Sequence, residues 1–223
     1  PMLKKIIRVG IPAALQMAIT SFSNIFVQSY INFFGENCMS GWTTYSKVDQ
    51  LLFLPMQSIS LASTTFVGQN MGNRNLERAE KGIRTAVILS MVVTGTLITL
   101  VCIFCVPLIK IFNADPAVLE YGRNFIRMIS PFYLIICFNQ IYAGALRGAG
   151  DTTTPMWVSM VSTIFIRVPV AYGLAYLTRT PEFPHGQPIA LFSSLMISWS
   201  LGMVISIIVF SLGRWKKKML LQH

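Results

Sequence analysis

Six long, mostly apolar segments constrain this chain more than any other feature. They cover about 6–34, 39–69, 83–109, 118–145, 155–177 and 189–212. A bilayer core roughly 30 Å thick is crossed by roughly 20 helical residues, so each segment is long enough to span it. Of the 223 residues, 53% are hydrophobic and 12% are charged, a composition too apolar for an ordinary soluble domain. The sequence predicts an all-α membrane protein, a six-transmembrane-helix bundle.

The basic residues are distributed unevenly around these segments. Two lie in the connections that would face one side, Lys110 and Arg179. Twelve lie at the other side, namely Lys4, Lys5, Arg8, Arg74, Arg78, Lys81, Arg84, Arg147, Arg214, Lys216, Lys217 and Lys218. By the positive-inside rule, both ends of this segment are expected in the cytoplasm, with the chain in a bacterial-type cytoplasmic membrane. The net charge of +10 therefore reflects topology, and we expect no nucleic-acid partner.

A short polar hinge separates the fourth and fifth segments. It reads Gly-Ala-Leu-Arg-Gly-Ala-Gly-Asp-Thr-Thr-Thr-Pro over 144–155. Gly148 and Gly150 permit a tight reversal, and Asp151 or Thr154 can cap the next helix. Pro155 fits a first helical turn, where a missing N–H costs little. The hinge holds Arg147 close to two spans, as suits a cytoplasmic membrane face.

This hinge resembles the loop found in each half of the multidrug and toxic compound extrusion (MATE) transporters. A second stretch, Gly68-Gln69-Asn70-Met71-Gly72, resembles the G-Q-N-x-G cytoplasmic segment of the same family. The resemblance covers essentially all of 1–223 as a single C-terminal six-helix lobe of a twelve-helix transporter. Because the chain starts with Pro1, it is interpreted as a fragment whose N-terminal lobe is missing.

The resemblance implies a cation-coupled antiporter that exports organic, often cationic, compounds by alternating access. Inward flow of Na⁺ or H⁺ would drive export, and no other cofactor or metal is expected. The bilayer, small organic substrates and the missing N-terminal lobe are the implied partners. One branch of the family carries acidic residues for cation binding on the first span of this half, and that span has none here.

A row of polar side chains follows the first apolar segment. Gln16, Thr20, Asn24 and Gln28 are four residues apart, so they form a slowly drifting stripe on one helix side. Amides facing lipid would be costly, so the stripe should face protein or water. Two interpretations stay open, interhelical hydrogen bonding and the wall of a solute cavity. Further candidates for the same cavity are Gln57, Asn139 and Gln140.

Two charged residues lie deep within the predicted spans. Asp49 is the only acidic residue well inside a span, and Arg167 lies at comparable depth in the fifth segment. An ionisable residue inside a membrane is by default a functional hypothesis. We take Asp49 and Arg167 as ion-coupling candidates that form an ion pair if their spans approach. That pair is either purely structural or breaks during transport.

Other functional classes find little support in the residues. The histidines, His185 and His223, fall in a loop and at the end of the chain, and no nucleophile or metal constellation appears, so an enzyme is not expected. Cys102 and Cys105 have redox spacing but lie in an apolar helix, which favours packing. The alternatives that remain are a lipid-linked oligosaccharide flippase of the same superfamily and a non-transporting membrane scaffold.

Several local features are also predicted. Pro12, Pro55 and Pro131 should bend their helices. Residues 35–38 should form a short outer turn, and 75–81 should form a short amphipathic helix on the membrane surface.

Overall fold

A computed structural model of the chain describes all residues except 1, 182–183, 185, 214 and 217–223. The described residues are mostly helical. The α-helices are α1 (Met2–Ile31), α2 (Glu36–Gly72), α3 (Leu76–Ile103), α4 (Cys105–Lys110), α5 (Pro116–Ile129), α6 (Tyr133–Gly148), α7 (Thr153–Met160), α8 (Arg167–Leu177) and α9 (Pro188–Ser211). Two 3₁₀ turns, η1 (Asn32–Phe34) and η2 (Ser130–Phe132), and one π-helical stretch, η3 (Val161–Ile166), connect some of them.

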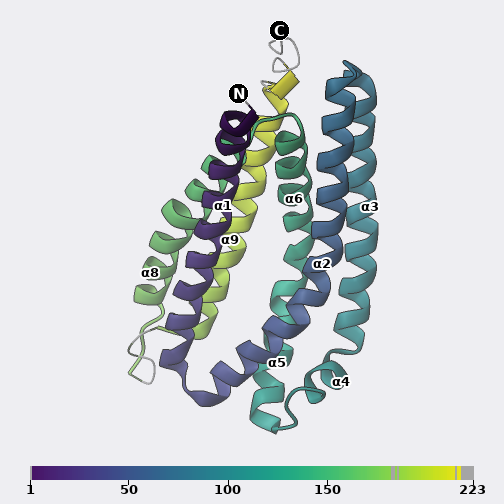
Figure 1. Ribbon diagram of the computed structural model, residues 1–223. Coiled ribbons are helices and arrows are strands. Elements are labelled where there is room, and N and C mark those ends of the chain that lie inside the picture. The colour runs from purple at the N-terminus through teal and green to yellow at the C-terminus, as the bar shows by residue number, and fades with distance from the viewer. Residues whose placement is uncertain (1, 182–183, 185, 214, 217–223) are drawn as a thin grey trace.

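These elements join into six helical segments long and apolar enough to cross a membrane. Their bounds are Val9–Phe34, Glu36–Gly72, Leu76–Ile103, Pro116–Gly148, Thr153–Leu177 and Pro188–Ser211. The predicted six-helix membrane bundle is therefore confirmed. The start of α1 and the end of α9 lie at the same end of the bundle as the α2–α3 and α6–α7 turns (Figure 1).

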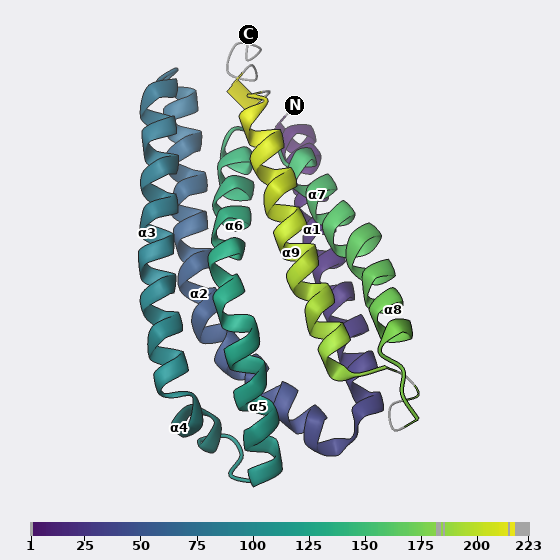
Figure 2. The same ribbon diagram turned by 180° about the vertical axis from the view of Figure 1, so that it is seen from behind.

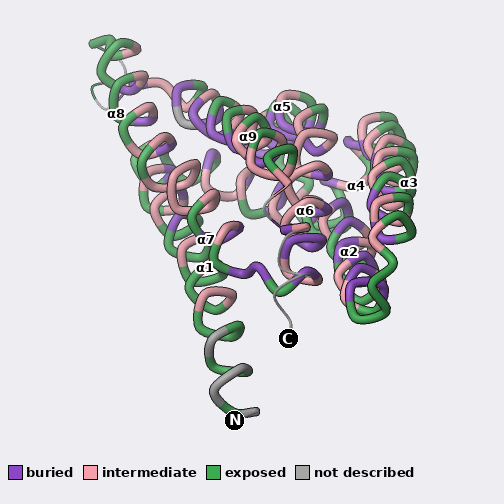
Figure 3. The backbone as a smooth tube through the Cα atoms, turned by 90° about the horizontal axis from the view of Figure 1, so that it is seen from above, coloured by how far each residue is buried: buried purple, intermediate pink, exposed green. Residues whose placement is uncertain are grey.

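The bundle consists of two groups of helices. On one side α2, α3 and α6 pack together, and on the other α1, α7, α8 and α9 pack together (Figures 1 and 2). Seen along the bundle, α8 and α2 lie on opposite sides, and α6 and α9 lie between them (Figure 3). Packing of α6 against α9 connects the two groups.

At the seam between α2 and α6 the two helix backbones approach closely. A Cβ atom added to Gly144 would lie 2.6 Å from Ser60 Oγ, and one added to Gly148 would lie 2.4 Å from the Thr64 carbonyl oxygen. Hydroxyls complete the seam, because Ser60 donates to the Gln140 carbonyl at 2.6 Å and Thr64 to the Gly144 carbonyl at 3.0 Å. Small residues and hydroxyls that let two backbones approach are typical of helix packing in membranes.

Proline affects the spans in different ways. Pro131, predicted to bend the fourth span, lies in η2, a 3₁₀ turn that separates α5 from α6. Pro55 lies within α2, which curves strongly along its length (Figure 1). Pro12 lies within α1, and the helix continues through it.

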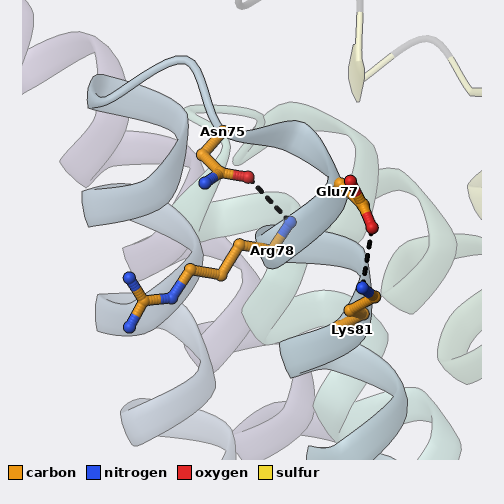
Figure 4. A network of polar contacts seen from close by, with 4 residues as sticks. All are labelled: Asn75, Glu77, Arg78 and Lys81. Atoms are coloured by element: carbon orange, nitrogen blue, oxygen red, sulfur yellow. Dashed lines mark hydrogen bonds and ion pairs between the residues drawn. The ribbon is translucent and has the colours of Figure 1, made fainter.

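Two local predictions differ from the structure. Residues 75–81 are not a separate surface helix: the turn at Asn75 leads directly into α3, and Asn75 caps it by accepting from the Arg78 N–H at 3.0 Å (Figure 4). The cap allows α3 to begin in polar sequence and continue into the apolar run. The outer turn predicted at 35–38 is shorter, because Gly35 has a φ of 88° and α2 begins at Glu36.

Candidate functional site

The polar row on α1 is divided between two environments. Gln16 and Gln28 are half-buried, whereas Thr20 and Asn24 are exposed. The Asn24 side chain makes no hydrogen bond within the described part of the chain, and Thr20 donates only to the Gln16 carbonyl of its own helix at 3.1 Å. Gln28 contacts Asn32 at 3.5 Å. The middle of the row is therefore open on this lobe, and only its N-terminal end, at Gln16, is engaged by other helices.

Gln16 is held by two neighbouring helices. Its amide nitrogen donates to Ser159 Oγ on α7 at 2.9 Å, and its amide oxygen accepts from the Arg147 guanidinium on α6 at 3.2 Å. For Gln16, interhelical hydrogen bonding thus describes the structure better than an open cavity wall. Arg147, expected to lie close to two spans, connects α6 to α1.

Asp49 on α2 is half-buried and belongs to a hydrogen-bonded chain. The hydroxyl of Tyr45, one turn earlier, donates to the Asp49 carboxylate at 3.3 Å. The same hydroxyl lies 2.9 Å from that of Tyr133 on α6. Both tyrosines are buried, with 4% and 1% of their surfaces exposed. The carboxylate is thus partly accessible at one end of a buried polar chain.

Arg167 does not pair with Asp49. Among the described residues, the ion pairs are Lys81–Glu77 and Lys216–Glu80. Arg167 is buried at the start of α8 and donates to Ser23 on α1. Its Nε has no hydrogen-bond partner within the part of the chain that the structure describes. The predicted Asp49–Arg167 pair is therefore wrong, because Arg167 is engaged by Ser23 on α1 and Asp49 by Tyr45 on its own helix. Similar depth did not mean proximity.

The polar candidates on α6 and α2 differ in their contacts. Asn139 connects α6 to α9 by donating to the Trp199 carbonyl at 3.3 Å and accepting from Ser206 at 2.8 Å. Asn139 is therefore an interhelical tie. The neighbouring Gln140 is half-buried and Gln57 on α2 is exposed, and neither side chain makes a hydrogen bond within the described part of the chain. These two stay available to a solute.

The two motif stretches form the same kind of turn at the ends of α2 and α6. The Asp151 N–H donates to the Leu146 carbonyl at 2.8 Å, and the Asn75 N–H donates to the Asn70 carbonyl at 2.9 Å. Both bonds close a helix C-terminus in the Schellman arrangement. Its left-handed position is Gly150 in one turn, with a φ of 80°, and Arg74 in the other, with a φ of 55°.

Several of the remaining motif residues make contacts that stabilise these turns. Asp151 accepts from the Thr154 N–H at 3.3 Å and hydroxyl at 2.7 Å, so the expected capping of the next helix is present. Asn70 is buried and donates to the Phe66 carbonyl at 2.7 Å. Gly68 packs toward the Gly148 carbonyl, whereas Gln69 and Gly72 are exposed. The motifs thus shape the α2–α3 and α6–α7 turns of the lobe.

A separate cavity of about 250 Å³ lies between the C-terminal end of α6, α7 and α9. Asp151 and Thr154 of the hinge line it, together with Trp157 and Trp215 and aliphatic side chains. None of the cavity candidates on α1, α2 and α6 contributes to its lining. This cavity is therefore distinct from the polar row.

Sequence reasoning missed the partners of the two deep charges. Tyr45 precedes Asp49 by four residues, so helical spacing could have indicated that contact. Tyr133 and Ser23 come from other helices, and no local pattern pointed to them. The π-helical stretch η3, directly before Arg167, also had no sequence signal; such segments occur often at functional sites.

Comparisons with known proteins agree with this architecture. The probable multidrug resistance protein NorM of Thermotoga maritima is 29% identical over 98% of this chain and 46% of its own length. The probable multidrug resistance protein YoeA of Bacillus subtilis is 25% identical over 96% of this chain and 44% of its own. The chain thus spans about half the length of the curated relatives it matches. Such relatives are named as resistance proteins or transporters, not as enzymes.

Solved structures show the same fold. An outward-facing multidrug resistance MATE family transporter of the MOP superfamily superposes with a TM-score of 0.84 at 19% identity, over 96% of this chain and 48% of that one. A MOP superfamily transporter from Pyrococcus furiosus, described as having reversed polarity in its binding pocket, gives 0.84 at 19% identity over 97% and 47%. The MatE family model matches residues 12–173, most of the six-helix bundle, and the chain therefore belongs to the MatE family.

Proposed function

We propose that this chain forms the C-terminal six-helix lobe of a cation-coupled antiporter that exports organic, often cationic, compounds by alternating access. The observation that carries the proposal is the set of polar side chains left uncovered on membrane-length helices. Asn24 and Thr20 on α1 and Gln57 on α2 are exposed on the lobe, and Asp49 is half-buried. Because hydrocarbon would penalise these groups, they are expected to face water or protein.

The second wall of this cavity is proposed to come from another six-helix lobe. Family relatives about twice as long as the chain support that arrangement. Transporters of this kind hold substrate near the bilayer midplane between two repeats. The cytoplasmic placement of both ends, in a bacterial-type cytoplasmic membrane, is supported by the many basic residues near the α2–α3 turn and the chain ends.

Asp49 is proposed as the group that couples ion entry to export. One carboxylate can neutralise either Na⁺ or H⁺, or a cationic drug, but not two cations at once. Binding of the ion from outside would thus release the drug there, and binding of the drug from inside would release the ion. Arg167 donates to Ser23 on α1 and does not contact Asp49, so we expect it to hold α8 to α1 rather than to bind the ion.

Efflux measurements on the intact transporter in proteoliposomes test this proposal. We expect export of tetraphenylphosphonium, a lipophilic aromatic cation, to follow an imposed Na⁺ or H⁺ gradient and to stop when an ionophore removes it. Asp49→Asn should abolish gradient-driven export, because the neutral amide cannot exchange one cation for another. Glu120→Gln is the matched control, since Glu120 is exposed on α5.

Two outcomes would contradict the proposal. Export by Asp49→Asn with unchanged rate and ion dependence would remove Asp49 from the coupling site. Absence of any gradient-dependent export by the wild-type transporter would favour another role, such as translocation of a lipid-linked oligosaccharide or a scaffold without transport. The first outcome removes only the carboxylate, and the second removes the antiporter itself.

A further inference from the structure

Three side chains form a continuous polar chain from the surface of α2 to the interior of α6. The Asp49 carboxylate accepts from Tyr45 at 3.3 Å, and the Tyr45 and Tyr133 hydroxyls are 2.9 Å apart. Tyr45 and Tyr133 are buried, and only Asp49 is partly accessible. The ring centroid of Trp42 lies 5.0 Å from that of Tyr45, and the ring centroid of Trp199 lies 6.2 Å from that of Tyr133. Water is therefore largely kept from the tyrosines.

This polar chain connects a curved, proline-containing helix to the break between α5 and α6. Asp49 and Tyr45 precede Pro55 within the curved helix α2. Tyr133 is the first residue of α6 and follows η2, the 3₁₀ turn with Pro131 at which α5 ends. The hydroxyl of Ser130 in that turn is buried without a hydrogen-bond partner in the described part of the chain. An unmet buried hydroxyl is a cost that a different geometry of the α5–α6 joint could relieve.

The number of donor hydrogens fixes the direction of the hydrogen bonds between these three side chains. Each tyrosine hydroxyl has one hydrogen to donate, and an ionised carboxylate can only accept. While Asp49 is ionised and vacant, Tyr45 donates to it and Tyr133 donates to Tyr45. When a proton or another cation occupies the carboxylate, Tyr45 is a weaker donor to it and turns its hydrogen toward Tyr133. Tyr133 must then direct its own hydrogen elsewhere at the joint.

We propose that Tyr45 and Tyr133 are positioning residues that convey the occupancy of Asp49 to the joint between α5 and α6. This inference rests on the proposed function, in which Asp49 exchanges an ion for a cationic substrate. The step is a reversal of hydrogen-bond direction, and no bond between heavy atoms changes. Occupancy on α2 thereby alters which arrangement of the proline-containing joint is favoured, and the joint packs against α9 through Tyr133 and Trp199.

The test uses the intact transporter with Tyr133→Phe, which removes one hydroxyl and leaves the contact of Tyr45 with Asp49. The affinity for tetraphenylphosphonium in detergent should stay within about twofold of wild type, since the binding carboxylate is untouched. The gradient-driven export rate should fall by about tenfold, the size expected when one buried hydrogen bond is lost. Tyr121→Phe on α5 is the control, because that hydroxyl makes no hydrogen bond in the described part of the chain.

A double variant tests whether the two tyrosines act as a unit. Tyr45→Phe should lower export at least as much as Tyr133→Phe, and the double variant should be no slower than Tyr45→Phe, since residues of one network are not additive. If Asp49→Asn abolishes export but Tyr133→Phe exports at the wild-type rate, this inference is overturned and the proposed function stands. Equal losses of affinity and rate in Tyr133→Phe would also overturn it, because they indicate a structural defect. Unchanged export by Asp49→Asn would instead refute the coupling role on which both depend.

Discussion

Helix α1 and the seam between α2 and α6 are held by very different contacts. At the seam, glycine and hydroxyl side chains bring two backbones together, and an added Cβ at Gly144 or Gly148 would overlap α2. On α1, the buried side chains are Ser23, Val27 and Ile31, four residues apart. Its other described side chains are exposed or half-buried. The difference indicates that the seam is the rigid part of the lobe. Helix α1 attaches along one narrow stripe of buried side chains and leaves its other sides uncovered.

The largest effect should come from enlarging the seam. Gly144→Val would place new atoms where Ser60 Oγ and the Ser60 carbonyl lie, at 2.6 and 2.7 Å from the first carbon. We expect the free energy of unfolding to fall by about 3 kcal/mol, the upper range for overpacking. Detergent-induced unfolding of the purified transporter measures it. Gly173→Ala on α8 is the control, because its new Cβ meets nothing within 4 Å; equal losses would contradict the rigid seam.

A smaller effect is expected where α1 attaches to α8. Ser23→Ala removes the hydroxyl that accepts from the buried Arg167 guanidinium. Loss of a hydrogen bond to a buried charged group should lower the free energy of unfolding by about 2 kcal/mol. The same unfolding measurement, with the exposed Ser21→Ala as control, separates this contact from general loss of hydroxyls. No difference between the two variants would mean that Arg167 does not hold α1.

The smallest effect should appear around Gln16, at the N-terminal end of the polar row on α1. Gln16→Leu removes the contacts with Ser159 and Arg147. Interhelical hydrogen bonds in membranes are worth about 1 kcal/mol, so amide hydrogen exchange in this part of α1 should speed up about fivefold. Exchange in α6 should not change. Faster exchange in both helices would show that α1 and the seam open together, against the proposed contrast.

Local turns could be predicted from the sequence, whereas contacts between helices could not. Gly150 predicted a turn and Asp151 a helix cap, because their backbone and side-chain preferences act over a few residues. Six spans followed from apolar length alone. The pairing of Asp49 with Arg167 failed because depth in the bilayer gives no information on which helices are neighbours. Asp49 instead accepts from Tyr45, whose hydroxyl meets that of Tyr133, and Arg167 donates to Ser23. The contacts made by Tyr133 and Ser23 became visible only once the helices were placed.

The sequence also could not predict which residues of the polar row on α1 neighbouring helices cover. Helical spacing placed Gln16, Thr20, Asn24 and Gln28 on one drifting side of α1, and the spacing alone allowed either a cavity wall or interhelical bonds. The structure assigns Gln16 to bonds with α6 and α7 and leaves Asn24 uncovered. Neighbouring helices cover only part of a drifting stripe, so the same periodic pattern contains both interhelical hydrogen bonds and uncovered polar side chains.

Accessibility of α1 to water tests the central claim most directly. In the intact transporter, with the native Cys38, Cys102, Cys105 and Cys137 replaced, single cysteines at Asn24 and Phe22 report opposite sides of α1. If the uncovered polar side borders an aqueous cavity, a membrane-impermeant thiol reagent should label Asn24→Cys, and bound tetraphenylphosphonium should slow the labelling. Phe22→Cys should resist labelling. Equal labelling of the two positions, or none at Asn24→Cys, would contradict the account.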